Sequence, residues 1–397
     1  MSELKSERLL TGKLVLLMVG TFGVFLGNGI ITPVLPVFVK DDLGGSDVAV
    51  GVVFAVQAIA AIAIRPWLTP KFNAWGVKPI LIGSMIASGL SFGLSAFVPN
   101  VFWLIVLRLI FGAAMAALFI GGLTAVTGLV SPVRSGEAIS LFSVAPYLSM
   151  GIGPIVGQAI FQAFGYVPTF LLAGGVAMLG VVPMIFYKSA PIAPLADAEG
   201  VRLKRFYGPA VWPGIVIALG IVGMLSFGAF MPLFALEIPG LEIQICFLIL
   251  SVGVLLVRTV GGRLPDRIGP KKTSVLATSA LIIGMAGLAT TMGPYWAYLA
   301  IIPFAFGQAL QYPSLLSLTL DDVSEQDRPV AISTFTLFFD VSQGFGGLIV
   351  GVVAAVGGYR SVFAASAFAA FIGLMIMLAI VLPRYEAGKK ARATVIA

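Results

Sequence analysis

Residues 14–39 read LVLLMVGTFGVFLGNGIITPVLPVFV and carry no charged side chain. A run of this length can cross the roughly 30 Å hydrocarbon core of a bilayer, which takes about 20 helical residues. Inside lipid every backbone N–H and C=O group needs a partner within the protein, so only helices and closed barrels span membranes. Barrel strands are shorter and alternate apolar with polar residues, and this run does neither. The stretch is therefore predicted to be a transmembrane helix.

The composition of the whole chain repeats this pattern. Of 397 residues, 59% are hydrophobic and 10% are charged, whereas a soluble domain carries about 25% charge. We infer an all-α membrane protein. The polar start, Met1 to Lys13, followed by a long apolar run rich in Gly and Pro, is not typical of a cleavable signal peptide. Cys246 is the single cysteine, so no internal disulfide is expected.

Twelve spans are predicted from the apolar blocks and the polar segments between them. They cover 14–39, 47–67, 79–98, 101–130, 137–163, 167–187, 209–236, 243–260, 273–292, 295–320, 330–356 and 360–383. The longest polar interruption lies between the sixth and seventh spans and indicates a linker between two six-helix halves. The predicted organisation is an N-terminal half, 1–187, a cytoplasmic linker, 188–208, and a C-terminal half, 209–397.

The basic residues are distributed unevenly between alternate loops. Of the 24 lysines and arginines, only Lys40 and Arg360 fall in loops that face outward if the N-terminus is inside, and Arg108 lies within a span. The remaining basic residues fall in inner segments, and the positive-inside rule sets orientation on such a bias. Both termini are predicted to be cytoplasmic, in the cell (inner) membrane. The net charge of +7 therefore reflects membrane sidedness, and no nucleic-acid partner is expected.

The two predicted halves are related in sequence by a constant offset of 193 residues. Arg65 corresponds to Arg258, and residues 138–140 (AIS) correspond to residues 331–333 (AIS). The same offset relates Asn73 to Asp266, Gly76 to Gly269, Gly151 to Gly344, Gly153 to Gly346, and Gly165-Tyr166 to Gly358-Tyr359. Two repeats of like orientation predict a pseudo-two-fold axis along the membrane normal, with a substrate site between the halves near mid-membrane.

One predicted cytoplasmic loop carries a family resemblance. Residues 262–272 read GRLPDRIGPKK and resemble the loop signature that the major facilitator superfamily has between the second and third helices of a half. The resemblance covers essentially the whole chain and implies a twelve-helix transporter fold that works by alternating access. It also implies a gating loop made of Arg258, Gly262, Arg263, Asp266, Arg267 and Gly269. The first-half copy departs from the pattern at Thr69, Asn73 and Ala74.

Two further motifs resemble the drug:proton antiporter branch of that superfamily. Arg108 with Gly112 is similar to the fourth-helix motif of proton-coupled members. Residues 151–157 read GIGPIVG and resemble the fifth-helix antiporter motif. The matching positions in that motif are Gly151, Gly153, Pro154 and Gly157. The resemblance implies exchange of a small amphipathic compound for protons.

The fifth-span motif also has a purely structural interpretation. Ser149, Gly153 and Gly157 repeat every four residues, the spacing of small residues that lets two helices approach closely. Pro154 removes one backbone hydrogen bond and can kink a helix. Close packing and a kink explain these residues without any antiport role, so both interpretations stay open.

Two ionisable side chains lie deep in predicted spans. Arg108 is about 12 Å into the fourth span and Asp340 about 15 Å into the eleventh, at ~1.5 Å per residue. Intramembrane charges are costly and usually mark function, although a static contact between helices is the alternative. The chain has no histidine, so a proton carrier has to be a carboxylate, a tyrosine or water. Asp340 and Arg108 are the predicted proton-coupling residues, with Glu237 and Glu242 as alternatives.

Uncharged polar residues at helical spacing predict the wall of a substrate cavity. Gln308, Gln311 and Tyr312 share one face of the tenth span, and amides are costly against lipid. Asn28 and Thr32 share a face of the first span. An aromatic stripe on the seventh span fits a pocket, a lipid-facing surface or packing between helices. The predicted cavity residues are Asn28, Thr32, Phe230, Gln308, Gln311, Tyr312 and Gln343.

These features predict a secondary transporter that exports a small amphipathic organic compound in exchange for protons. The alternative is a facilitator or proton symporter for a polar metabolite. An enzyme is not expected, because the sequence offers no reactive constellation, no metal-ligand cluster and no cofactor motif. The expected partners are a small-molecule substrate, protons and the lipid bilayer, and the expected state is a monomer.

Overall fold

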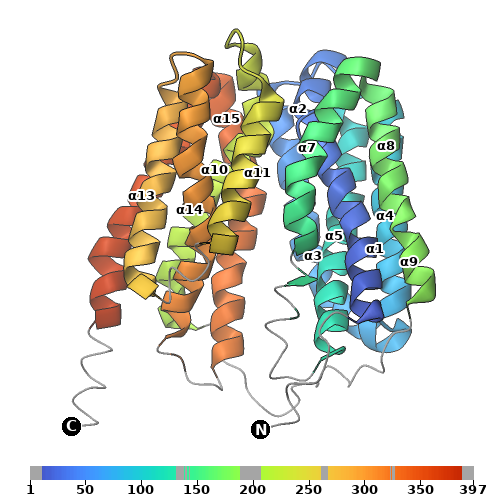
Figure 1. Ribbon diagram of the computed structural model, residues 1–397, viewed down its shortest axis with the longest axis horizontal. Helices are drawn as coiled ribbons and strands as arrows, with labels where there is room; N and C mark the ends of the chain where they lie inside the picture. The colour runs from blue at the N-terminus through green and yellow to red at the C-terminus, as the bar shows by residue number, and fades with distance from the viewer. Residues whose placement is uncertain are drawn as a thin grey trace. The chain divides into compact units, whose positions relative to one another are not determined.

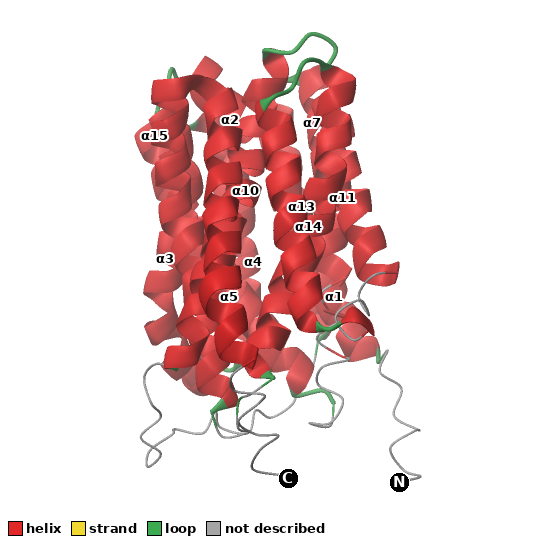
Figure 2. Ribbon diagram, turned by 90° about the vertical axis from the view of Figure 1, so that its left-hand side faces the viewer, coloured by secondary structure: helices red, strands yellow, loops and turns green. Residues whose placement is uncertain are grey.

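The computed structural model describes residues 11–130, 138, 141–142, 144–187, 207–260, 267–321, 323 and 327–386. Every regular element in these ranges is helical (Figures 1 and 2). The helices of the first part are α1 (Gly12–Ile31), α2 (Leu35–Val37), α3 (Asp47–Trp75), α4 (Val77–Leu94), α5 (Val101–Thr127), α7 (Val144–Phe164), α8 (Tyr166–Leu179) and α9 (Val181–Phe186). Those of the second part are α10 (Val211–Leu236), α11 (Ile243–Val260), α13 (Pro270–Ala289), α14 (Pro294–Leu320) and α15 (Arg328–Ile376).

Ten helices in the described ranges are long and apolar enough to cross a membrane. The predicted span 243–260 appears as a shorter apolar helix, Ile243–Thr259. The last two predicted spans form one continuous helical stretch, Val330–Glu386. The backbone leaves helical geometry inside it at Gly358, where φ is 74°. The prediction of a membrane protein built from apolar helices is confirmed, whereas the count of twelve spans is not.

The first predicted span, 14–39, is not one helix. α1 ends at Ile31, and a turn separates it from the short α2. Thr32, the residue before Pro33, keeps helical dihedral angles. Proline has no backbone N–H to continue the helical hydrogen bonds, which accounts for the break at Pro33. The turn is held by hydrogen bonds from the Thr32 N–H to the Asn28 carbonyl (3.1 Å) and from the Val34 N–H to the Ile31 carbonyl (3.1 Å).

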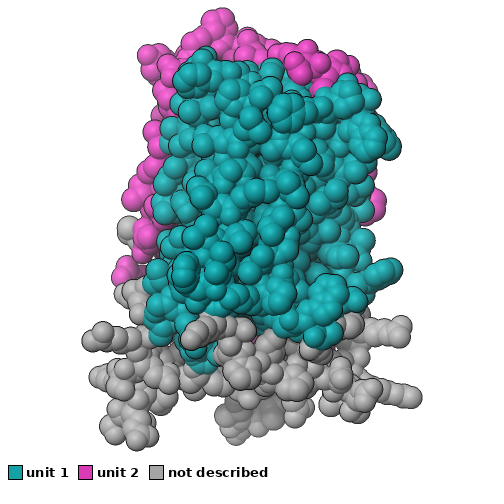
Figure 3. All heavy atoms as spheres, turned by 90° about the vertical axis from the view of Figure 1, so that its right-hand side faces the viewer, with its two compact units in different colours: residues 1–38, 59–199 teal, residues 39–58, 200–397 magenta. Residues whose placement is uncertain are grey.

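The chain forms two compact units (Figure 3). Unit 1 comprises Met1–Phe38 and Ile59–Glu199, and unit 2 comprises Val39–Ala58 and Gly200–Ala397. The boundary between them passes through α3, whose first part belongs to unit 2. Each unit is described by itself below.

In unit 1, α1 packs against both α7 and α8. Glycines on α1 remove the side chains that would otherwise separate the backbones. A methyl group on Gly23 would lie 2.6 Å from the Val176 carbonyl oxygen, and one on Gly27 would lie 2.6 Å from the Ala173 carbonyl oxygen. Small residues allow this approach between membrane helices, so α1 is held against α8 by backbone contact.

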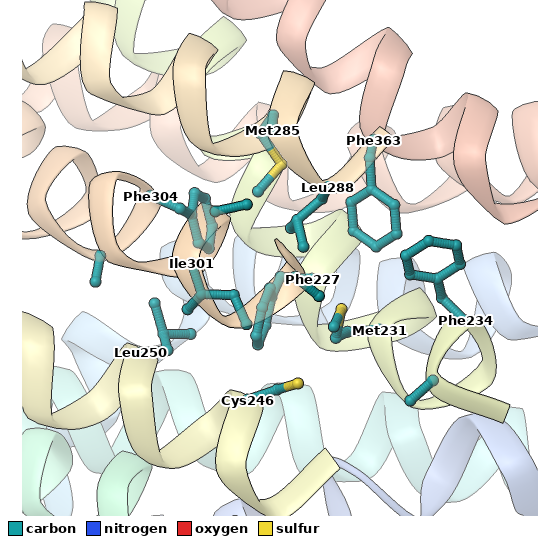
Figure 4. Packing of buried hydrophobic residues seen from close by; sticks show 14 of the residues in the cluster. Phe227, Met231, Phe234, Cys246, Leu250, Met285, Leu288, Ile301, Phe304 and Phe363 are labelled. Carbon is teal, nitrogen blue, oxygen red and sulfur yellow. The ribbon is translucent and has the colours of Figure 1, made fainter. Parts of the chain in front are cut away.

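In unit 2, a large apolar cluster joins α10, α11, α13, α14 and the end of α15 (Figure 4). Phe227, Met231 and Phe234 project from α10 into it and are fully buried. The Phe227 ring stacks on Phe304 at 5.5 Å and meets Phe247 edge-on at 5.3 Å. The aromatic stripe of α10 therefore packs between helices.

The start of α3 packs against α15 within unit 2. A methyl group on Gly51 would overlap the Gly347 carbonyl oxygen, and one on Gly351 would lie 3.0 Å from the Gly51 Cα. Asp47 accepts hydrogen bonds from the Lys40 ammonium at 2.9 Å and the Tyr359 hydroxyl at 3.2 Å. Glycine contacts and a small polar network together hold the segment Val39–Ala58 in this unit.

Candidate functional site

Arg108 is a buried cation in the middle of unit 1. It lies on α5 with 2% of its surface exposed. Its Cζ atom lies 5.6 Å from the ring centroid of Phe111 and 5.9 Å from that of Phe92. These are cation–π distances. Within the described ranges, Nη2 of Arg108 has no hydrogen-bond partner.

Asn28 of α1 and Thr32, which directly follows the end of that helix, are half-buried. The Thr32 hydroxyl donates to the Asn28 carbonyl at 2.7 Å, one turn earlier in the chain. The hydroxyl is therefore satisfied within its own segment and takes part in the break described above. Asn28 stands between Gly27 and Gly29, the residues through which α1 touches its neighbours.

The antiporter-like motif forms a backbone contact between α7 and α1. Gly153, Pro154 and Gly157 are buried, and Gly151 is half-buried. A methyl group on Gly153 would lie 2.6 Å from the Gly29 Cα, and one on Gly157 would overlap the Ile30 carbonyl oxygen. The structure thus brings this motif together with the end of α1 by close packing.

Two amides on α14 dominate the polar part of unit 2. Gln311 has 2% of its surface exposed, and Gln308 is half-buried. Nε2 of each amide is buried and has no hydrogen-bond partner in the described structure. The Gln311 amide occupies the space that a side chain at Gly220 of α10 would need. Both residues thus carry buried donors that have no partner among the described residues.

The remaining predicted cavity residues of unit 2 differ in their surroundings. Tyr312 is half-buried, with its ring 5.5 Å from Phe335 and 5.7 Å from Phe339. Gln343 on α15 is half-buried. Phe230 is fully buried, with its ring 6.0 Å from Tyr359. These contacts place Tyr312 and Phe230 in aromatic packing.

Asp340 is half-buried on α15. Two positions further along, the Ser342 hydroxyl donates to the Ala218 carbonyl of α10 at 2.6 Å. Nearer the end of α10, the hydroxyls of Ser226 and Ser366 are hydrogen-bonded at 2.7 Å. Polar contacts therefore join α10 and α15 at two points, and the nearer one lies two residues beyond Asp340. The alternative carboxylates, Glu237 and Glu242, are exposed.

The predicted gating loop is described only in part. Gly262, Arg263 and Asp266 lie outside the described residues. Arg258, near the end of α11, is half-buried, and Arg267 is exposed. Gly269 has φ 86° and directly precedes α13. A positive φ is readily adopted by glycine, which explains this residue at the turn into the helix.

The sequence alone did not reveal several residues that surround the candidate site residues. Gly220 carries no pattern that marks it among the 47 glycines, although it makes room for the Gln311 amide. The Ser342–Ala218 contact and the Asp47–Tyr359 contact join residues 124 and 312 positions apart. Pairings over such separations leave no trace in one sequence. In the described ranges no group of three or more Cys, Asp or Glu side chains is arranged to hold a metal ion.

Apolar helices long enough to cross a bilayer, with polar side chains buried among them, define an integral membrane protein. The family model of the Major Facilitator Superfamily matches residues 17–327. The chain belongs to this superfamily, whose members are membrane transporters and not enzymes.

Curated relatives match the chain over most of its length. The multi-drug resistance efflux pump PmrA of Streptococcus pneumoniae is 26% identical over 373 residues, covering 88% of this chain and 92% of PmrA. An uncharacterized MFS-type transporter of Burkholderia pseudomallei is 28% identical over 376 residues, covering 90% of this chain and 89% of the relative.

Solved structures share the fold at lower identity. A mutant of the nucleoside transporter NupG superposes with a TM-score of 0.77 at 16% identity, covering 92% of this chain and 99% of that one. A mutant of the peptide transporter POT in complex with sulfate gives a TM-score of 0.78 at 14% identity, covering 94% and 95%.

Proposed function

We propose that this protein is a secondary active transporter that exports a small amphipathic organic compound in exchange for protons by alternating access. The observation that carries the proposal is Asp340, a half-buried carboxylate well inside an apolar helix. A carboxylate at such a depth is costly and is usually kept for a function. Similarity to a multi-drug efflux pump over 88% of this chain supports export of drug-like compounds.

The proposed architecture has twelve spans in two six-helix halves, 1–187 and 209–397, joined by a cytoplasmic linker, 188–208. Both termini lie in the cytoplasm, and the protein works as a monomer in the inner membrane. The number of spans is supported if the stretch Val330–Glu386 is counted as two spans that meet at Gly358 and Ile243–Thr259 is counted as a short span. The resemblance of residues 262–272 to a gating loop supports rocking of the halves during transport.

Asp340 carries the proton in this proposal, and Arg108 supplies a fixed positive charge in the other unit. The energetics are sufficient. A membrane potential of 100 mV is worth about 2.3 kcal/mol per charge moved, and one pH unit adds about 1.4 kcal/mol per proton. One proton per cycle can therefore drive accumulation on the order of 100-fold or more, since about 1.4 kcal/mol is tenfold.

The second candidate is a facilitator or proton symporter for a polar metabolite. Two observations favour it: the buried amide donors of Gln308 and Gln311, and the shared fold with nucleoside and peptide transporters. Proton movement distinguishes the candidates. An antiporter acidifies the side from which substrate is removed, a symporter moves protons with the substrate, and a facilitator moves none.

The test is Asp340→Asn in proteoliposomes with an imposed pH gradient. The asparagine keeps the shape and hydrogen-bonding capacity of the side chain but cannot titrate. We expect the variant to bind substrate and exchange it down its gradient, and to lose proton-driven uphill transport. Asp42→Asn, at an exposed outer position, is the matched control and should transport normally. Full uphill transport by Asp340→Asn would show that another group carries the proton, whereas a wild type that shows no proton-driven uphill transport would be a facilitator.

A further inference from the structure

We propose that Arg108 is the binding residue for an anionic group of the substrate, and that the transported compounds are organic anions with an apolar aromatic body. The inference rests on the transport function proposed above and narrows its substrate class. It begins from a guanidinium that is 2% exposed and has an unpartnered Nη2 in the described structure.

The surroundings of the guanidinium are aromatic. Phe92 of α4 and Phe111 of α5 lie with their ring centroids 4.8 Å apart, and both face the Arg108 guanidinium at cation–π distance. The Phe92 ring also lies against α1, since a methyl group on Gly27 would lie 3.0 Å from the ring. The rings stabilise the cation partially, but they accept none of its hydrogen bonds.

Unit 1 offers no described counter-charge to this cation. None of its described residues is Asp or Glu. Its acidic residues, Glu3, Glu7, Glu137, Asp197 and Glu199, all lie outside the described ranges. Arg108 makes no ion pair with any residue that the structure describes. A static brace between helices, the alternative role for a buried arginine, would need a partner of this kind.

A buried charge without a partner destabilises the protein unless an opposite charge or a set of hydrogen bonds compensates it. Arginine presents a planar fork of N–H donors that matches a carboxylate or sulfonate with two parallel hydrogen bonds. The flanking phenylalanines favour an apolar, aromatic body next to the acidic group. A cationic substrate would be repelled by the same guanidinium. The geometry therefore selects aromatic acids over amines of equal size.

The first test needs no ligand. In Arg108→Met the side chain keeps an unbranched apolar stem but is shorter and loses the charged guanidinium. If the cation has no counter-charge in the substrate-free protein, the purified full-length variant should melt several degrees higher than the wild type. Arg360→Gln is the control, because Arg360 is exposed and also lies over a phenylalanine ring. A lower melting temperature for Arg108→Met would show that a protein group neutralises Arg108, and would overturn the proposal.

The second test uses three probes that share one ring system: indole-3-acetate, indole-3-acetamide and tryptamine, which are an anion, a neutral amide and a cation at pH 7. A ligand that binds the native state raises its melting temperature. The wild type should be stabilised by indole-3-acetate at concentrations at least ten times lower than by the other two. Arg108→Gln should lose this preference, Arg108→Lys should keep part of it, and Arg360→Gln should keep all of it.

The other possible results contradict the anion site. Stronger stabilisation by tryptamine or the amide, equal stabilisation by all three probes, or no stabilisation by any of them would overturn it.

A failure of the proposed transport function can be told apart from a failure of the anion site. Arg108-dependent binding of indole-3-acetate without any proton-driven transport in proteoliposomes would support the anion site and reject the antiporter function. Suppose instead that a cationic compound is exported in a proton-driven way and that Arg108→Lys exports it at the same rate. That result would support the antiporter function and contradict the anion site.

Discussion

Gln311 shows how a single missing side chain shapes a polar site. Its amide lies against α10 at Gly220, where even a methyl group would overlap it. The Gln311 backbone carbonyl accepts a hydrogen bond from Ser314 at 3.2 Å, while the side-chain Nε2 has no partner in the described structure. An unsatisfied buried donor costs stability, so a donor kept at this place is well suited to bind a substrate acceptor.

Gly220→Ala tests this arrangement. The added methyl group forces the Gln311 amide out of its place, and overpacking of this kind costs about 1–3 kcal/mol. We expect a lower melting temperature and weaker substrate binding. The double variant Gly220→Ala with Gln311→Ala should recover stability but not binding. Gly228→Ala on the same helix, where a methyl group meets nothing within 4 Å, is the control. Normal melting of Gly220→Ala would show that the amide is not confined.

At the scale of helices, the fifth-span motif has a clear structural role. Gly153 and Gly157 of α7 lie directly against the backbone of Gly29 and Ile30 at the end of α1. The Ser149 hydroxyl donates to the Ala145 carbonyl of its own helix at 2.8 Å and lies 3.4 Å from the Phe22 carbonyl of α1. The resemblance to an antiporter motif and the need for close packing thus fall on the same residues. The packing interpretation is sufficient to explain their size.

Gly157→Ala separates the two interpretations. The methyl group would overlap the Ile30 carbonyl oxygen, so α7 and α1 should move apart and the melting temperature should fall, by an amount on the order of 1–3 kcal/mol in stability. Gly175→Ala on α8 is the control, because nothing lies within 4 Å of the added methyl group. Unchanged melting together with loss of proton exchange would assign the motif a role in antiport instead of packing.

For the whole molecule, the proposed orientation rests on the basic residues of the predicted inner segments. Cysteines at Ser2, Asp197 and Ala397 should resist a membrane-impermeant maleimide added from outside, because the positive-inside rule places all three in the cytoplasm. A cysteine at Asp42, which is exposed and lies in a predicted outer segment, should react and is the positive control. The native Cys246 is buried and is replaced by alanine in the background. Labelling of any of the three inner positions in intact cells would reverse the orientation.

The course of the chain between the two units was not predicted. The sequence repeat ends one half after the sixth span, yet the segment Val39–Ala58 belongs to unit 2. The contacts of Gly51 with Gly347 and Gly351, and of Asp47 with Tyr359, place it there. Such contacts depend on where α3 meets α15 in space. A repeat identifies which segments correspond and does not identify which segments touch.

The sequence by itself determined the class of fold, because apolar runs without charges leave the backbone no alternative to helices in lipid. It also identified Arg108 and Asp340, since a charged residue inside such an apolar run is recognised from the sequence alone. The break beside Pro33, the space that Gly220 leaves for Gln311, and the aromatic setting of Arg108 were decided only by the tertiary structure. The burial of a side chain and its hydrogen-bond partners depend on which side chains from different helices come into contact. Hydropathy along one chain carries no information about these contacts.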